Sequence, residues 1–158
     1  MIRLCREDEH NTMFTIINDA AQAYKGHIPF NCYHEPYMPM EELVSEMKRV
    51  TMFGWEENGL LLGVMGLEPV KDVTLIRHAY VLTQKQGLGI GHQLLVHLEK
   101  QTQTRRLLVG TWTDATWAVD FYKRHGFALS NNKNQLLKTY WDNPVQQNEA
   151  SVVLEKVL

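Results

Sequence analysis

Residues 86–92 read Gln-Gly-Leu-Gly-Ile-Gly-His, with a glycine at every second position from Gly87 to Gly91. An apolar stretch, Val73–Val81, precedes them, and apolar residues spaced by four follow them. This pattern predicts a strand, a tight glycine-rich turn and a helix from about Gly89 to Thr104. The first N–H groups of such a helix have no partner within the helix and lie at the positive end of its dipole, so they bind phosphate groups. The turn is therefore a candidate phosphate site, and the alternative is a glycine turn that serves packing only.

Two common nucleotide-binding motifs do not fit this turn. A dinucleotide motif would need its third glycine at position 92, which is His92, and an acidic residue about twenty positions further along a strand end. The phosphate loop that ends in Gly-Lys-Ser/Thr is also missing. A phosphate ligand of another kind is therefore expected.

The rest of the chain alternates between helix and strand patterns. The Asn58-Gly59 pair predicts a tight hairpin, and Gly126 stands where a left-handed residue ends a helix. An irregular, proline-rich segment is expected over 28–40. Helices are expected between Asp8 and Gly26, over 40–49, over 89–104 and from Thr113 or Asp114 to His125, with strands over 2–5, 51–56, 60–68, 73–81, 106–112, 136–141 and 150–154. This order predicts an α/β domain with a mixed sheet.

Composition excludes several classes of protein. The 158 residues are 44% hydrophobic and 22% charged, which predicts a single folded domain over residues 1–158. The net charge of −2 lacks the basic excess of a nucleic-acid binder, and no apolar run reaches the length of a membrane helix. The sequence begins without a signal-peptide pattern, and the spacing of Cys5 and Cys32 fits neither a metal site nor a disulfide framework. We therefore expect a reduced, cytoplasmic setting and no metal.

Two motifs together resemble one enzyme family. Gln86, Gly89 and Gly91 match the pattern Q/R-x-x-G-x-G/A, and residues 121–127 read Phe-Tyr-Lys-Arg-His-Gly-Phe. The first is similar to the acyl-CoA loop of the GNAT N-acetyltransferases, and the second to the F/L-Y-x-x-x-G-F ending of a later helix in that family. The resemblance extends over essentially the whole chain, because the order of elements also agrees.

The resemblance implies a fold and a cofactor site. It implies an α/β (α+β) fold with a mixed, mostly antiparallel sheet of about six to seven strands flanked by helices, in which strands 73–81 and 106–112 splay apart. The pantetheine arm of acetyl-CoA is then expected in the gap, where a backbone N–H would polarise the thioester carbonyl. The implied cofactor-binding residues are Tyr80, Val81, Leu82, Gln86, Gly87, Leu88, Gly89, Ile90, Gly91 and His92.

The resemblance also implies a reaction, the transfer of an acetyl group from acetyl-CoA to a primary amine by direct attack in a ternary complex. Tyr122 would be the general acid for the leaving thiolate, with a buried core tyrosine as the alternative. The base would be Glu68 or His78; each has a structural alternative, a solvated strand end or a sheet-face histidine. Tyr33, His34, Glu35 and Tyr37 in the proline-rich segment are candidates for the acceptor pocket or for loop packing.

One departure from the family leaves a second function open. Ala115 stands where the family often has an asparagine that helps to hold the pantetheine arm. A non-catalytic acyl-CoA-binding sensor or regulatory domain is therefore the alternative to an enzyme. A homodimer that pairs through Trp141 and the final strand is a further hypothesis.

Overall fold

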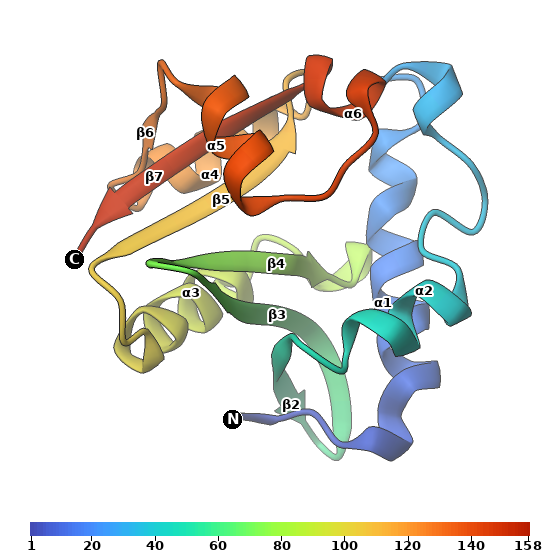
Figure 1. Cartoon of the computed structure of the whole chain (residues 1–158). Helices are drawn as coiled ribbons and strands as arrows, with labels where there is room; N and C mark the ends of the chain where they lie inside the picture. Colours follow the sequence, from blue (N-terminus) through green and yellow to red (C-terminus); the bar gives the residue numbers. More distant parts are fainter. The chain divides into compact units, whose positions relative to one another are not determined.

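The computed structural model describes all 158 residues, and it confirms the α/β fold class (Figure 1). There are seven strands, as expected. The pairs β1–β2, β2–β3, β5–β7 and β6–β7 are antiparallel. They are β1 (Ile2–Leu4), β2 (Thr51–Glu57), β3 (Leu60–Val70), β4 (Val73–Val81), β5 (Arg106–Trp112), β6 (Ala128–Leu129) and β7 (Ser151–Val157). The helices are α1 (His10–Ala21), α2 (Met40–Glu46), α3 (Ile90–Gln101), α4 (Thr116–Arg124), α5 (Lys133–Tyr140) and α6 (Val145–Glu149), with short 3-10 helices η1 (Glu7–Glu9), η2 (Gln22–Tyr24), η3 (Phe30–Cys32) and η4 (Thr83–Lys85). None of these helices is long and apolar enough to cross a membrane.

The chain divides into two compact units. The first consists of Met1–Ala23, Glu35–Glu68 and Ile76–Thr102, and the second of Tyr24–His34, Pro69–Leu75 and Gln103–Leu158. The single domain over residues 1–158 and the splayed pair of strands stay predictions.

In the first unit the strand order is β1-β2-β3-β4. The hairpin between β2 and β3 turns through Asn58 and Gly59, whose φ angles are 51° and 79°. A pair of positive φ angles suits a two-residue turn that follows the twist of antiparallel strands, which confirms the predicted hairpin. A register shift between Trp55 and Glu56 bends β2 just before this turn.

The core of the first unit lies between its helices and strands. Met13, Ile16 and Ile17 face inward from α1 because residues three and four apart share one side of a helix. Each fully buried aliphatic side chain contributes about 1.5–3 kcal/mol relative to exposure. Helix α3 packs on β2, where the rings of Phe53 and His97 meet edge to face with centroids 5.0 Å apart.

In the second unit the strand order is β5-β7-β6, and β5 pairs with β7 from Arg106 opposite Val157 to Trp112 opposite Ser151. Its core cluster consists of Val73, Leu75, Leu108, Leu136, Leu137 and Val153. Since β6 pairs with β7 at Leu154 and Glu155, β7 has neighbours on both sides there. The homodimer stays a prediction.

The strand predicted over 136–141 is wrong, because this segment belongs to helix α5. Leu136 and Leu137 lie on one face of that helix and are buried in the core of the second unit, with Tyr140 one turn later packed against it. A short apolar run of this kind fits a buried helix or a strand equally well by periodicity. Two short elements, β6 and α6, have no counterpart in the sequence prediction.

Candidate active site

The glycine-rich turn has the backbone conformation that its sequence predicts. Gly87 and Gly89 have φ angles of 80° and 84°, in the left-handed region that side chains with a Cβ disfavour. A Cβ at either position would meet no atom within 4 Å, so backbone conformation alone explains the need for glycine. We refer to residues 86–92 as the donor turn.

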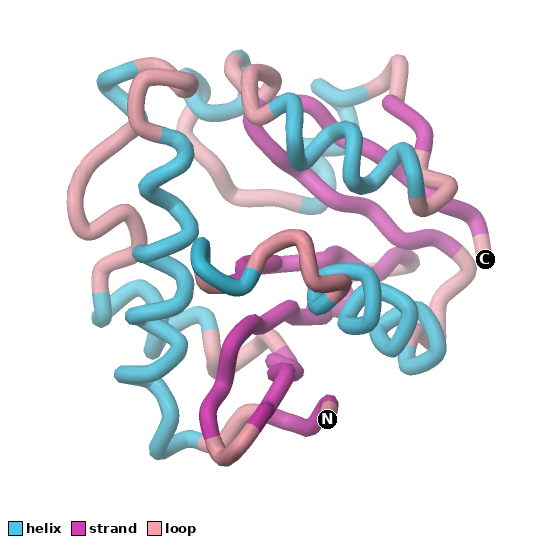
Figure 2. The backbone as a smooth tube through the Cα atoms, turned by 180° about the vertical axis from the view of Figure 1, so that it is seen from behind, coloured by secondary structure: helices cyan, strands magenta, loops and turns pink.

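Helix α3 begins directly at the donor turn (Figure 2). Gly89 is its N-cap, and its carbonyl accepts the first helical hydrogen bond from Gln93 at 3.0 Å. No side chain caps the first turn. The N–H groups of Ile90 and Gly91 are in the first turn, where the helix itself supplies no acceptor, which is the arrangement that binds a phosphate group at a helix N-terminus.

Gln86 connects the donor turn to the end of β4. Its side-chain amide donates a hydrogen bond to the Val81 carbonyl at 3.0 Å. This contact holds the two ends of the connecting segment together, with η4 between them. The structure therefore places the motif glutamine in a contact that shapes the turn.

The backbone N–H groups at the end of β4 point alternately toward β3 and toward the opposite edge of β4. The Leu82 N–H donates to the Leu62 carbonyl of β3 at 2.9 Å, and the side chains of Tyr80 and Leu82 pack against the core of the first unit. Because successive residues of a strand direct their backbone groups to opposite edges, Val81 directs its N–H away from β3. Of the three residues predicted to contact the pantetheine arm, Tyr80, Val81 and Leu82, Val81 is thus the one whose N–H points to the edge of β4 opposite β3.

Glu68, the first candidate base, is engaged by two arginines. Its Oε1 accepts a hydrogen bond from Arg77 at 2.6 Å and its Oε2 one from Arg49 at 2.9 Å. The residue lies in β3, two residues before its end, and is only 8% exposed. The predicted alternative of a solvated strand end is therefore wrong, since β3 continues to Val70 and Glu68 is buried in ion pairs.

His78, the second candidate base, lies in β4 with an unusual backbone. Its φ angle is 54°, which is rare for a residue other than glycine. Adjacent residues of a regular strand point to opposite faces, yet Arg77 and His78 both contact Glu46 of α2. The left-handed residue interrupts the alternation and brings both side chains to the same carboxylate.

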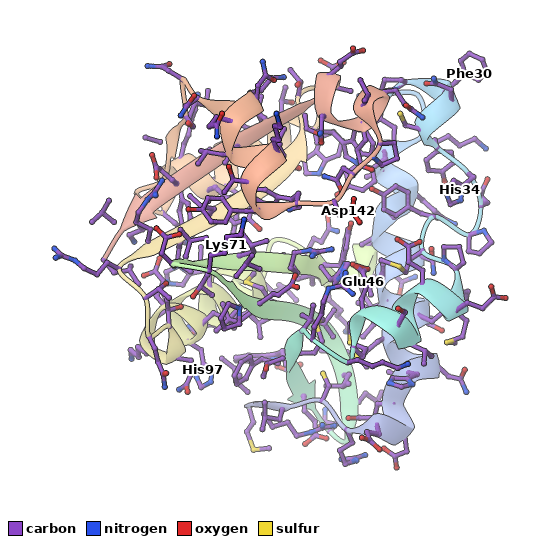
Figure 3. All side chains as sticks on the ribbon, in the orientation of Figure 1. Phe30, His34, Glu46, Lys71, His97 and Asp142 are labelled. Carbon is purple, nitrogen blue, oxygen red and sulfur yellow. The ribbon has the colours of Figure 1, made fainter.

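The contact between His78 and Glu46 is buried. His78 Nε2 lies 3.1 Å from Glu46 Oε2, and the two side chains are 8% and 6% exposed. Neither atom has a hydrogen-bond partner. Figure 3 labels Glu46, which extends from α2.

Three residues of this cluster were missed by the sequence analysis: Glu46, Arg49 and Arg77. Arg77 bridges the carboxylates of Glu46 and Glu68, and Arg49 contacts the same two. The available signals were a glutamate three residues after buried Leu43 on one helix face and an arginine inside an apolar strand. We call Glu46, Arg49, Glu68, Arg77 and His78 the base cluster.

The base cluster favours ionised Glu46. Burial by itself would raise the pKa of this carboxyl, but His78, Arg77 and Arg49 outweigh it and hold the pKa below its usual value. Glu46 is therefore a carboxylate at neutral pH, although it is almost fully buried.

Tyr122 lies on α4 and is 5% exposed. Its ring meets Phe121 and Phe127 edge to face, with centroids 5.1 and 5.4 Å away. Burial, with a smaller contribution from Tyr24, raises the pKa of the phenol. The Tyr122 hydroxyl thus stays protonated at neutral pH. Gly126, after the end of α4, has the expected left-handed φ of 88°.

Ala115 precedes α4 as its N-cap residue and is completely buried, without a side chain that caps the helix. An asparagine side chain at an N-cap would accept a hydrogen bond from the first turn.

The four candidate acceptor residues lie in the expected irregular segment, which contains η3 and otherwise little regular structure. Tyr33 and Tyr37 are partly buried, whereas His34 and Glu35 are exposed. Phe30 on η3 is 93% exposed, the most open large apolar side chain of the molecule (Figure 3). The role of the four residues stays a prediction.

No three His, Cys, Asp or Glu side chains come together in the structure as a group that could hold a metal ion.

Comparisons with known proteins agree with these features. Residues 18–138 match the family model described as the acetyltransferase (GNAT) domain, and no curated protein matches the chain. The PaiA N-acetyltransferase of Thermoplasma acidophilum, solved with coenzyme A, has a TM-score of 0.77 at 16% identity, covering 100% of this chain and 98% of that one.

Two further solved structures are similar over 100% of this chain. A GNAT-family acetyltransferase of Staphylococcus aureus Mu50 has a TM-score of 0.75 at 15% identity, with 98% of that chain covered. The ribosomal-protein-alanine N-acetyltransferase of Brucella melitensis has a TM-score of 0.72 at 17% identity, with 99% covered. The whole chain thus has the fold that its two motifs imply, and it belongs to the GNAT acetyltransferase family.

Proposed function

We propose that this protein transfers an acetyl group from acetyl-CoA to a primary amine of a small molecule or peptide, by direct attack in a ternary complex. The observation that carries the proposal is the donor turn, in which two left-handed glycines lead into the uncapped start of α3. The resemblance of the motifs and the family match support an acyl-CoA as the ligand of this turn.

The donor turn and the end of β4 bind different parts of acetyl-CoA. The N–H groups of Ile90 and Gly91 at the start of α3 bind the pyrophosphate, because they lie at the positive end of a helix dipole. The Val81 N–H, directed away from β3, donates to the pantetheine arm or to the thioester carbonyl. A donor at that carbonyl stabilises the negative charge that develops on its oxygen during attack.

Proton transfer is the second requirement of the reaction. An amine with a pKa near 10.4 is protonated at pH 7, and making it neutral costs about 4–5 kcal/mol. The base that removes this proton is Glu68 or His78. The amine then attacks the acetyl carbon, the carbon–sulfur bond breaks, and Tyr122 protonates the thiolate. Of the two protons that the ammonium loses, one ends on CoA and one in solvent.

A non-catalytic acyl-CoA sensor is the second candidate function, and Ala115 is the observation that favours it. Its methyl group cannot make the contact to the pantetheine arm that an asparagine would make. Under this alternative the protein binds acetyl-CoA and releases no CoA with any amine.

Calorimetric titration of acetyl-CoA, with NAD and ATP as controls, tests the proposed ligand. We expect micromolar binding of acetyl-CoA and none of the controls. A panel of small amines and peptide N-termini, assayed for free CoA, then separates the two functions. Binding without release of CoA from any amine supports the sensor, and absence of binding to any acyl-CoA contradicts both.

A further inference from the structure

We propose that Glu46 is a positioning residue for His78, so that His78, and not Glu68, removes the proton from the acceptor amine. This inference rests on the proposed acetyl transfer and decides between its two candidate bases. Glu46 itself touches neither acetyl-CoA nor the amine in this scheme.

Glu68 is unsuited to the role of base because both of its oxygens are occupied. Arg77 donates to Oε1 at 2.6 Å and Arg49 to Oε2 at 2.9 Å. A carboxylate that accepts charged hydrogen bonds on both oxygens gives its lone pairs to the guanidinium groups. A Glu68 that took up the proton would give up its ion pairs with Arg77 and Arg49.

Only one of the two carboxylate oxygens of Glu46 accepts hydrogen bonds. Its Oε1 contacts Arg77 and Arg49, whereas its Oε2 lies 3.1 Å from His78 Nε2. The guanidinium of Arg77 therefore orients the carboxylate and leaves the second oxygen directed at the imidazole. Of the four carboxylate oxygens in the base cluster, Glu46 Oε2 is the one without a hydrogen bond.

The backbone of β4 supports the same arrangement. The left-handed conformation at His78, with φ of 54°, is energetically unfavourable for a residue with a side chain. It places the imidazole beside the same carboxylate that the preceding Arg77 holds. Strained residues of this kind persist where the surrounding contacts determine them, and they cluster at functional sites.

Glu46 is the charged group in contact with His78, and the other charged groups of the cluster are Arg77 of β4, Arg49 after α2 and Glu68 of β3. When the acceptor's N–H bond breaks, the proton bonds to an imidazole nitrogen, and the amine keeps its electron pair for attack. The imidazolium formed lies beside Glu46 Oε2, which stabilises it as a carboxylate stabilises the histidine of a catalytic triad. Because Nε2 faces Glu46 Oε2, the proton from the amine goes to Nδ1 in this scheme.

The test compares Glu46→Gln with Glu42→Gln, an exposed glutamate on the same helix. We expect E46Q to lower kcat roughly 10- to 100-fold, since it weakens a general base without removing it. The Kd for acetyl-CoA should stay within about twofold, because the donor turn is unchanged. E42Q should match the wild type in both.

Two further readouts separate positioning from structural support. The loss in E46Q should shrink between pH 7 and pH 9.5, because more of the acceptor amine is then neutral without a base. The double variant E46Q/H78N should be no slower than H78N alone, since the effect of Glu46 passes through His78. If the two losses multiply, or if E46Q keeps the kcat of the wild type, the inference is wrong.

A conservative variant covers the case in which E46Q does not fold. Glu46→Asp keeps the charge near Arg77 but draws the carboxylate back from His78. We expect E46D to bind acetyl-CoA normally and to turn over at least about fivefold more slowly. Turnover of E46D equal to the wild type would overturn the inference. A wild type that binds acetyl-CoA but acetylates no amine would instead refute the proposed enzyme.

Discussion

The donor turn and the base cluster differ in how they are built. The donor turn is seven consecutive residues whose conformation depends on their own backbone, with Gly87 and Gly89 in the left-handed region. The base cluster draws five side chains from α2, β3, β4 and the segment after α2. One is a property of a local sequence, and the other exists only when distant segments pack.

This difference has energetic consequences. A substitution in the donor turn changes backbone preferences by about 1–2 kcal/mol and acts locally. Removing one partner from a buried set of ion pairs leaves an uncompensated charge, which costs about 3–5 kcal/mol. We therefore expect the donor turn to control binding of acetyl-CoA, and the base cluster to control turnover and stability together.

The largest expected effect is in the base cluster. His78→Asn removes the imidazole but suits the left-handed backbone, because asparagine adopts that conformation more readily than most residues. We expect kcat to fall roughly 10²- to 10⁴-fold at pH 7, the contribution of a general base. Steady-state release of CoA measures the loss.

The matched control for this variant is His97→Asn on α3, whose ring packs on Phe53. It should keep the wild-type kcat. If Glu68→Gln abolishes turnover in a folded protein while H78N does not, Glu68 is the base.

The next effect concerns the general acid. Tyr122→Phe keeps the ring contacts with Phe121 and Phe127 and removes only the hydroxyl. We expect kcat to fall roughly 10- to 100-fold, at the lower end for a general acid, because a thiolate is a modest base. Binding of acetyl-CoA, measured by calorimetry, should be unchanged.

Tyr140→Phe serves as the control, since its hydroxyl bonds Asp72 on the exposed surface at 2.6 Å. Equal kcat for Tyr122→Phe and the wild type would mean that Tyr122 is a core residue.

A pair of glycines tests the donor turn itself. Gly89→Ala and Gly59→Ala place the same methyl group at φ angles of 84° and 79°, each with no atom within 4 Å. Both should destabilise the fold by about 1–2 kcal/mol, seen as a lower Tm. Only G89A should raise the Kd for acetyl-CoA, by roughly tenfold, since a strained turn misaligns the donors at the start of α3. Equal Kd values for both variants would contradict a phosphate site at the donor turn.

The smallest effect concerns the link between the two regions. Gln86→Ala removes the hydrogen bond to the Val81 carbonyl, which contributes about 1 kcal/mol. The Kd for acetyl-CoA should rise a few-fold while kcat stays the same. Gln84→Ala, at an exposed position in η4, is the control. A fall in kcat for Q86A would show that this end of β4 also orders the base cluster.

Much of the fold was predictable from the sequence because its signals are local. The Asn58-Gly59 hairpin, the strands over 73–81 and 106–112, and the left-handed Gly126 all follow from residue type and spacing. Helix α5 was not predictable, since Leu136 and Leu137 fit either structure until the strands they pack against are known.

The sequence by itself determined the donor turn, because a left-handed conformation at glycine is a property of the residue and its neighbours. It also supplied Glu68 and His78 as candidate bases without ranking them. The tertiary structure alone decided that Arg49 and Arg77 occupy Glu68 and that Glu46 faces His78. Side-chain partners from separate elements depend on packing and on the unusual backbone at His78, and neither follows from spacing along the chain.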